Sequence, residues 1–298
     1  MSHAGRSTFY GLWAVLLWAT IATAFKIALR GLDVFQTVLI ASFVAAVALV
    51  LILIVRGRWG LLLNQGRAGW GRSAITGLVV PLAYYLVLLA AYNRLSAQEA
   101  MTLNYLWPLI LSVMAAFFLR QPLSIMTLLG LALGLLGVTV IATHGHPLNL
   151  SFSSPTGVAL ALGSTVIWAA FWISSLKDSR DEGVKLATNF LFGTLYAGVA
   201  WALFSRALPQ ATASTAAAVY IGFFEMGFTF LLWLTALRSA PRVAVITNLA
   251  FLTPFLSLVV IRVVLGEPLH LSSLAGLVLI VTGIIFSALK RKQGLNGG

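Results

Sequence analysis

Long apolar runs, each about the length of a membrane-spanning helix, dominate this sequence. A helix needs about 20 apolar residues to cross the hydrocarbon core of a bilayer. Ten such runs are present, at 8–29, 34–55, 73–92, 98–119, 123–143, 156–176, 184–205, 213–237, 242–265 and 268–289. Charged residues make up only 9% of the chain, too few for the water-facing shell of a soluble domain. The pattern predicts an all-α polytopic membrane protein with ten transmembrane helices.

Basic residues concentrate in alternate connections between these runs. The chain has 19 Lys and Arg against 7 Asp and Glu. Connections on one side carry fourteen of the basic residues, and the other side carries Lys26, Arg30, Arg94, Arg206 and Arg262. Because cytoplasmic loops retain Lys and Arg during insertion, we expect both termini in the cytoplasm and the protein in the cytoplasmic (inner) membrane. The net charge of +12 thus reflects topology, and no nucleic-acid partner is expected. The longest connection, 56–72, is predicted to be a loop.

The two halves of the sequence match each other. A shift of 146 positions aligns Pro108 with Pro254, Pro122 with Pro268, Gly130 with Gly276, and Gly137 with Gly283, without a gap. Each half holds five runs, and because five is odd, the second half enters the membrane the opposite way up. The sequence therefore predicts two five-helix inverted repeats, residues 1–147 and 148–298, an architecture typical of secondary transporters.

The aligned residues also resemble a known family. Asn248, Pro254, Glu267-Pro268-Leu269, Gly276 and Gly283 are similar to the pattern of EamA domains in the drug/metabolite transporter superfamily, and Asn104, Pro108, Gln121-Pro122-Leu123, Gly130 and Gly137 form a degenerate first copy. The resemblance covers essentially the whole chain. The length and aromatic content of the chain are most similar to those of the YddG-type exporters of aromatic amino acids. The resemblance implies export of aromatic and other amphipathic amino acids by alternating access.

Aromatic side chains at mid-depth are candidates for lining a substrate cavity. Tyr and Trp combine a flat apolar ring with a hydrogen-bonding edge, which suits an aromatic amino acid. Most Trp and Tyr in membrane proteins belong to interfacial belts or helix packing, but a belt role at mid-depth leaves the hydroxyl or indole N–H without a partner. Cavity lining and packing both stay open for Tyr84, Tyr105, Trp107 and Trp168, with Tyr85 and Trp172 ranked below them.

Two asparagines precede prolines at neighbouring positions of the two halves. Asn104 comes shortly before Pro108, and Asn248 shortly before Pro254. A proline frees a backbone carbonyl one turn earlier, and a nearby amide satisfies that carbonyl or binds substrate. The alternative is a hydrogen bond that joins two helices. With Pro81, these prolines are the predicted helix kinks.

Glu225 is the acidic residue predicted to lie deepest in the membrane. It falls midway along 213–237, with Thr229 one turn further on and no Lys or Arg at that depth of the helix. An ionisable side chain in hydrocarbon is costly and marks function by default. Three roles are open for Glu225: it binds a substrate ammonium group, relays a proton, or stays protonated and joins helices.

Catalysis finds no support in the sequence. The chain has no Cys and no Gly-rich Walker motif, and its four His residues have no acidic companions at metal-ligand spacing; His144 and His146 share one external loop and are expected to be solvated. We therefore expect no cofactor, no metal and no enzyme activity, and a monomer whose partners are a small-molecule substrate and the lipid bilayer. The rival functions are a carrier of nucleotide sugars or sugar phosphates, for which only Lys26 and Arg262 come close to a cavity, and a channel or membrane-embedded enzyme.

Overall fold

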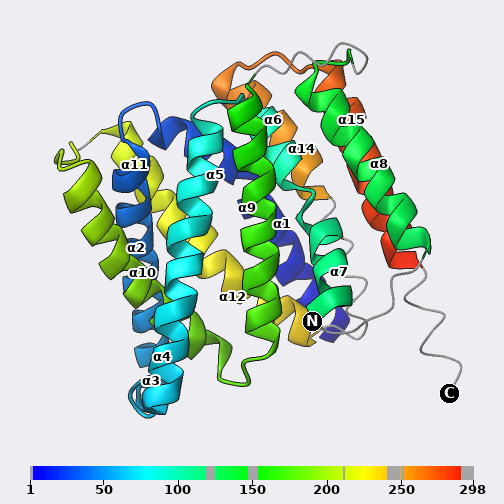
Figure 1. The fold of residues 1–298 in the computed structure, drawn as a ribbon. Coiled ribbons are helices and arrows are strands. Elements are labelled where there is room, and N and C mark those ends of the chain that lie inside the picture. Colours follow the sequence, from blue (N-terminus) through cyan, green and yellow to red (C-terminus); the bar gives the residue numbers. More distant parts are fainter. Residues whose placement is uncertain are drawn as a thin grey trace, which may run out of the picture. The chain divides into compact units, whose positions relative to one another are not determined.

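The computed structural model of the chain describes residues 3–118, 125–146, 154–210, 212–239, 249 and 252–289, and the regular structure in these residues is helical (Figure 1). Two compact units form. Unit 1 comprises Met1–Leu89 and Ser179–Gly266, and unit 2 comprises Ala90–Asp178 and Glu267–Gly298. Each unit therefore combines helices from both halves of the sequence, and the compact units differ from the predicted repeats.

The helices of the two units are as follows. Unit 1 contains α1 (His3–Ala28), α2 (Val34–Val55), α3 (Trp59–Leu63), α4 (Gly66–Gly77), η1 (Leu78–Ala83), most of α5 (Tyr84–Tyr92), α10 (Glu182–Phe204), α11 (Ala213–Tyr220), η2 (Ile221–Phe228), α12 (Thr229–Ser239), α14 (Leu252–Val260) and η3 (Ile261–Leu265). Unit 2 contains α6 (Ala97–Asn104), α7 (Trp107–Phe118), α8 (Ile125–Ala142), α9 (Pro155–Leu176) and α15 (Leu271–Leu289). The three η elements are π-helical segments.

Seven apolar helical stretches in the described residues are long enough to cross a membrane. They are Ser7–Ala28, Val34–Val55, Gly66–Tyr92, Ala97–Phe118, Pro155–Ser175, Glu182–Phe204 and Ala213–Trp233. Three shorter apolar helices, Leu128–Ile141, Leu252–Leu265 and Leu271–Phe286, fall within the predicted fifth, ninth and tenth spans. A polytopic helical membrane protein is thus confirmed, whereas the number ten and the pairing into repeats stay predictions.

The segment 56–72, predicted to be a loop, is largely helical, and that expectation is wrong. It contains α3 and the first part of α4. Five glycines lower its helix propensity, but tertiary contacts stabilise the helical structure. The Arg180 guanidinium donates from Nη1 to Gln65 Oε1 at 2.5 Å, to the Gly69 carbonyl at 2.8 Å and to Ser73 Oγ at 3.1 Å. A cation just before α10 therefore holds α4 in place.

The helices α2 and α10 form an antiparallel pair in unit 1. Each begins after an aspartate cap: Asp33 Oδ1 accepts the Gln36 N–H at 2.8 Å, and Asp181 Oδ1 accepts the Gly183 N–H at 2.9 Å. The start of α2 meets the end of α10, since Gln36 Nε2 donates to the Ala207 carbonyl at 2.9 Å. These caps satisfy backbone N–H groups that helix termini otherwise leave without partners.

The helices α8 and α15 pack side by side in unit 2 through glycines (Figure 1). A Cβ added to Gly130 would lie 2.4 Å from the Gly283 carbonyl oxygen, and one added to Gly137 would lie 2.6 Å from that of Gly276, so only glycine allows this approach. In the sequence repeat, Gly130 corresponds to Gly276 and Gly137 to Gly283. The contacts exchange these partners, as a local two-fold axis between antiparallel equivalent helices requires. This exchange supports the predicted inverted repeat.

Candidate functional site

The strongest candidate site in unit 1 joins Glu225 to Tyr85. Glu225 lies in η2, and the fully buried Tyr85 lies in the first turn of α5. The Tyr85 hydroxyl donates to Glu225 Oε1 at 3.3 Å, which is long for a hydrogen bond between two oxygens. The second carboxyl oxygen, Oε2, is buried without a hydrogen-bond partner among the described residues. The carboxyl group thus has acceptor capacity that the fold does not use.

Aromatic rings surround the Tyr85 side chain. The Tyr84 ring meets the Tyr85 ring edge-on, with 4.8 Å between centroids, and the Phe25 ring from α1 lies 6.3 Å away. Tyr84 itself is buried. The structure therefore brings Tyr84, which the sequence singled out, into the same group as Glu225 through Tyr85. These rings offer apolar faces beside a carboxyl group.

Helix interruptions position this group. Val80, just before Pro81 in η1, has the non-helical angles φ −138° and ψ 120°. Pro81 is buried against α10, where a Cβ at Gly193 would lie 2.3 Å from the proline ring. Glu225 also sits in a π-helical segment, a feature found frequently at functional sites. Both partners of the Glu225–Tyr85 hydrogen bond therefore lie in or next to irregular helix.

Sequence reasoning missed a second group of polar and aromatic contacts in unit 1. The Thr20 and Tyr220 hydroxyls are hydrogen-bonded at 2.7 Å, joining α1 to α11 one turn before Glu225. Trp18 packs against Trp233 and Phe230, with ring centroids 5.2 and 6.3 Å apart. These residues come from opposite halves of the chain, and nothing in the local sequence pairs them.

In unit 2, the predicted site residues lie around the break between α6 and α7. The α6 helix ends at Asn104, residues 105 and 106 form a turn, and α7 begins at Trp107. Asn104 Nδ2 donates to Ser164 Oγ of α9 at 2.8 Å, a bond of the helix-joining kind. Pro108 is the second residue of α7, a position at which a backbone N–H has no partner within the helix, so proline is tolerated there.

The aromatic candidates of unit 2 differ in burial. Trp168 of α9 is buried and stacks on Phe171, with 5.5 Å between ring centroids. Tyr105 and Trp107 are half-buried. In the second half of the chain, Pro254 is buried as the third residue of α14, whereas Asn248 lies outside the described residues.

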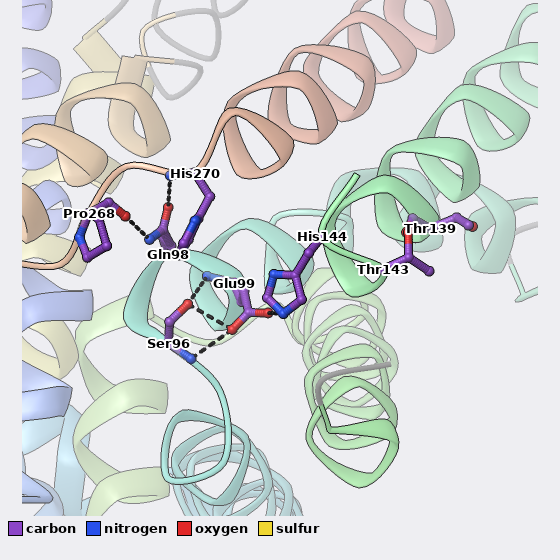
Figure 2. A network of polar contacts seen from close by, with 8 residues as sticks. All are labelled: Ser96, Gln98, Glu99, Thr139, Thr143, His144, Pro268 and His270. Carbon is purple, nitrogen blue, oxygen red and sulfur yellow. Dashed lines mark hydrogen bonds and ion pairs between the residues drawn. The ribbon is translucent and has the colours of Figure 1, made fainter. Parts of the chain in front are cut away.

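A polar network in unit 2 joins the first turn of α6 to the residues that follow α8 and to the residues that precede α15 (Figure 2). Gln98 Nε2 donates to the Pro268 carbonyl at 2.8 Å, and Gln98 Oε1 accepts the His270 N–H at 3.2 Å. Glu99 Oε2 accepts from the Ser96 backbone N–H at 3.0 Å and from Ser96 Oγ at 2.8 Å. The network therefore fixes the N-terminal end of α6, whereas Asn104 lies at its C-terminal end.

The expectation that His144 is merely solvated is incomplete. Its side chain is 46% exposed, but Nε2 lies 3.7 Å from Glu99 Oε1 (Figure 2). Its ring also meets the His270 ring edge-on, with 5.9 Å between centroids. The acid comes from α6 and the second histidine from the residues just before α15, so the sequence around His144 does not reveal them.

Known proteins resemble this chain along most of its length. The uncharacterized transporter YvbV of Bacillus subtilis is 28% identical and covers 75% of this chain and 73% of its own length. The aromatic amino acid exporter YddG of Salmonella typhimurium is 25% identical over 97% of this chain and 98% of its own, and that of Escherichia coli is 25% identical over 97% and 99%. One solved crystal structure shares the fold, with a TM-score of 0.70 at 21% identity, over 99% of this chain and 100% of the other.

The family match covers nearly the whole sequence. The EamA-like transporter family matches twice in tandem, at residues 6–143 and 155–289. Both matches include apolar helices of membrane-spanning length. The family resemblance seen in the sequence is thereby confirmed. The chain belongs to the EamA-like transporter family.

Proposed function

We propose that this membrane transporter exports aromatic and other amphipathic amino acids across the cytoplasmic membrane by alternating access. The observation that carries the proposal is the buried Glu225 carboxyl group, which has an unused oxygen beside three aromatic rings. The YddG relatives, named as aromatic amino acid exporters, support the substrate class. The family supports transport over catalysis.

The chemistry of the Glu225 group suits an amino acid. Tyr85 holds one carboxyl oxygen, so the other is free to accept an N–H of a substrate ammonium group or to take up a proton. The rings of Tyr84 and Phe25 provide apolar faces for an aromatic side chain. Tyr105, Trp107, Trp168, Asn104 and Asn248 complete the set of proposed substrate-binding residues. For Asn104 the alternative is the hydrogen bond to Ser164 that joins α6 to α9.

The proposal includes a topology. Both termini lie in the cytoplasm, and residues 1–147 and 148–298 form inverted five-helix repeats. The exchanged glycine contacts between α8 and α15 support the repeat, and the distribution of basic residues supports the orientation. Reporter fusions test the orientation directly, because an external reporter signal from either terminus contradicts it.

Counterflow in proteoliposomes tests the transport mechanism. Vesicles that contain the purified chain are loaded with unlabelled phenylalanine, and uptake of labelled phenylalanine is followed. A carrier gives faster uptake when the inside is loaded, because the loaded site returns more readily than the empty one. A channel or an enzyme gives no such acceleration. Acceleration by a nucleotide sugar or a sugar phosphate, and not by any amino acid, would assign the protein to the rival class of substrates.

A further inference from the structure

A pocket lies at the end of unit 1 where α2 ends and α10 begins, on the side predicted to face the cytoplasm. Its lining combines an apolar wall with charged groups. The wall consists of Leu49, Ile52, Leu53 and Leu231, and the remaining lining residues are Arg56, Arg58, Asp181, Glu182, Gly183 and Thr235. Such a lining suits an amphipathic ligand with a charged head and an apolar tail.

The acidic residues of this pocket already have partners. Asp181 Oδ2 forms an ion pair with Arg58 Nη1 at 2.8 Å, and Asp181 Oδ1 accepts the N–H groups of Gly183 and Val184 at 2.9 and 3.2 Å. Glu182 Oε1 pairs with the Lys185 ammonium group at 2.8 Å. These contacts largely neutralise the two carboxylates, so neither excludes an anion from the pocket.

Arg56 supplies the remaining charge. It is the residue that caps the C-terminal end of α2, it is exposed, and its guanidinium has no hydrogen-bond or ion-pair partner within the described part of the chain. A guanidinium with its donors open binds phosphate through two parallel hydrogen bonds. Arg56 therefore gives the pocket a positive charge that the paired carboxylates do not balance.

Exposed apolar side chains continue from the pocket on both sides of Arg56. Val55 in the last turn of α2 is 86% exposed, and Ile54 beside it is 50% exposed. In α3, Trp59 and Leu61 are 42% and 52% exposed. A free amino acid is too short to cover side chains on both elements, whereas the acyl chains of a lipid reach them. A Trp beside exposed arginines is typical of the boundary between hydrocarbon and head groups.

We propose that this end of unit 1 is a binding site for an anionic phospholipid. Arg56 binds the phosphate, the half-buried Ile52 and the exposed Ile54 and Val55 contact the upper part of an acyl chain, and α3 lies in the head-group layer. Basic pockets beside transmembrane helices on the cytoplasmic side are suited to anionic head groups, because that leaflet carries a negative surface potential. The site is separate from the Glu225 group and does not depend on the substrate.

Native mass spectrometry of the full chain in detergent tests the site with matched variants. The probe is phosphatidylglycerol, compared with phosphatidylcholine, and the variants are Arg56→Gln and Arg67→Gln. Arg67 is an exposed arginine of the same basic segment that does not line the pocket. We expect the wild type and Arg67→Gln to retain phosphatidylglycerol in preference to phosphatidylcholine, and Arg56→Gln to bind phosphatidylglycerol about fivefold more weakly.

Each of the following outcomes would overturn the proposal. Equal weakening by both variants would mean a diffuse attraction to the leaflet and no site. Displacement of the lipid by inorganic phosphate at equal concentration would assign the pocket to a free anion, and displacement by phenylalanine would assign it to the substrate. If Arg56→Gln is not monodisperse, Ile52→Trp fills the apolar wall while keeping the charge, and it should reduce phosphatidylglycerol binding at least threefold; unchanged binding contradicts the site.

Discussion

Two glutamates, Glu99 in unit 2 and Glu225 in unit 1, show how differently this chain uses a carboxyl group away from water. Glu99 is buried at the start of α6, where Oε2 accepts two hydrogen bonds from Ser96 and Oε1 faces His144 at 3.7 Å. Glu225 has one long hydrogen bond, from Tyr85, and a buried oxygen without a partner in the described residues. Both carboxyl groups are largely removed from solvent, but only one is fully engaged by the fold.

The difference separates a structural role from a functional one. Buried polar atoms are nearly always hydrogen-bonded, because an unsatisfied atom loses its hydration without replacement. Glu99 follows this rule as half of a capping box. Glu225 departs from it, and a substrate or a proton is what would complete its hydrogen bonding. Substitution of Glu99 should therefore change mainly stability, and substitution of Glu225 should change mainly transport.

The largest effect is expected for Glu225→Gln. This substitution keeps the size of the side chain and removes its negative charge, so a substrate ammonium group loses its charged partner and no proton is carried. We expect the initial rate of phenylalanine counterflow to fall at least tenfold. The thermal unfolding midpoint serves as the control and should change little. Normal transport at every pH would show that neither ammonium binding nor proton coupling needs this carboxyl group.

A smaller effect on transport is expected for Tyr85→Phe. The ring and its contacts with Tyr84 and Phe25 stay, but Glu225 Oε1 loses its donor. The carboxyl group is then held less firmly, and we expect counterflow to slow about fivefold, in line with one lost hydrogen bond. Tyr84→Phe is the matched control, because it removes the neighbouring hydroxyl and keeps the Tyr84 ring that packs edge-on against Tyr85. Equal loss in both variants would show that the effect is not specific to the hydrogen bond between Tyr85 and Glu225.

For Glu99→Gln we expect a loss of stability and little change in transport. The amide keeps part of the capping interaction with Ser96 but removes the carboxylate oxygen that faces His144 Nε2, so we expect the free energy of unfolding to fall by about 1 kcal/mol. Thermal or denaturant unfolding measures this change. Counterflow per folded molecule should stay within about twofold of the wild type. A transport defect as large as that of Glu225→Gln would erase the distinction between the two glutamates.

The smallest effect is expected for Asn104→Ala. If the Asn104 amide joins α6 to α9 through Ser164, its loss costs about 0.6 kcal/mol of stability, as interhelical hydrogen bonds in membranes average. Ser164→Ala should then cost about the same, and the double variant little more than either single one. A raised KM for phenylalanine in Asn104→Ala alone would instead assign this asparagine to substrate contact.

Local features of the fold were predictable, because they depend on residues close in sequence. The predicted run 34–55 coincides with α2, whose start is fixed by Asp33 immediately before it. The glycine matches pointed to α8 and α15 as equivalent helices. By contrast, α3 and the first part of α4 were missed, since their glycine-rich sequence favours a loop, whereas contacts with distant residues, such as those of Arg180 with Gln65 and Gly69, stabilise the helical structure.

The candidate site was only half predictable. Glu225 stands out because a carboxyl group in an apolar run is unusual, but its partner Tyr85 lies 140 residues away and was ranked below Tyr84. A hydrogen bond over that separation depends on how helices pack, which no local pattern encodes. The same holds for Glu99 and His144, which come together only when α6 and α8 do.

The glycine contacts between α8 and α15 also set an order of assembly. Residues 143–270 are synthesised after α8 ends and before α15 begins. Throughout that interval α15, against which Gly130 and Gly137 pack, has not yet been made. The glycine-lined face of α8 is then covered by lipid or by another segment. Chains that stop before Leu271 should therefore be recognised by quality-control proteases even though most of their helices have already been inserted.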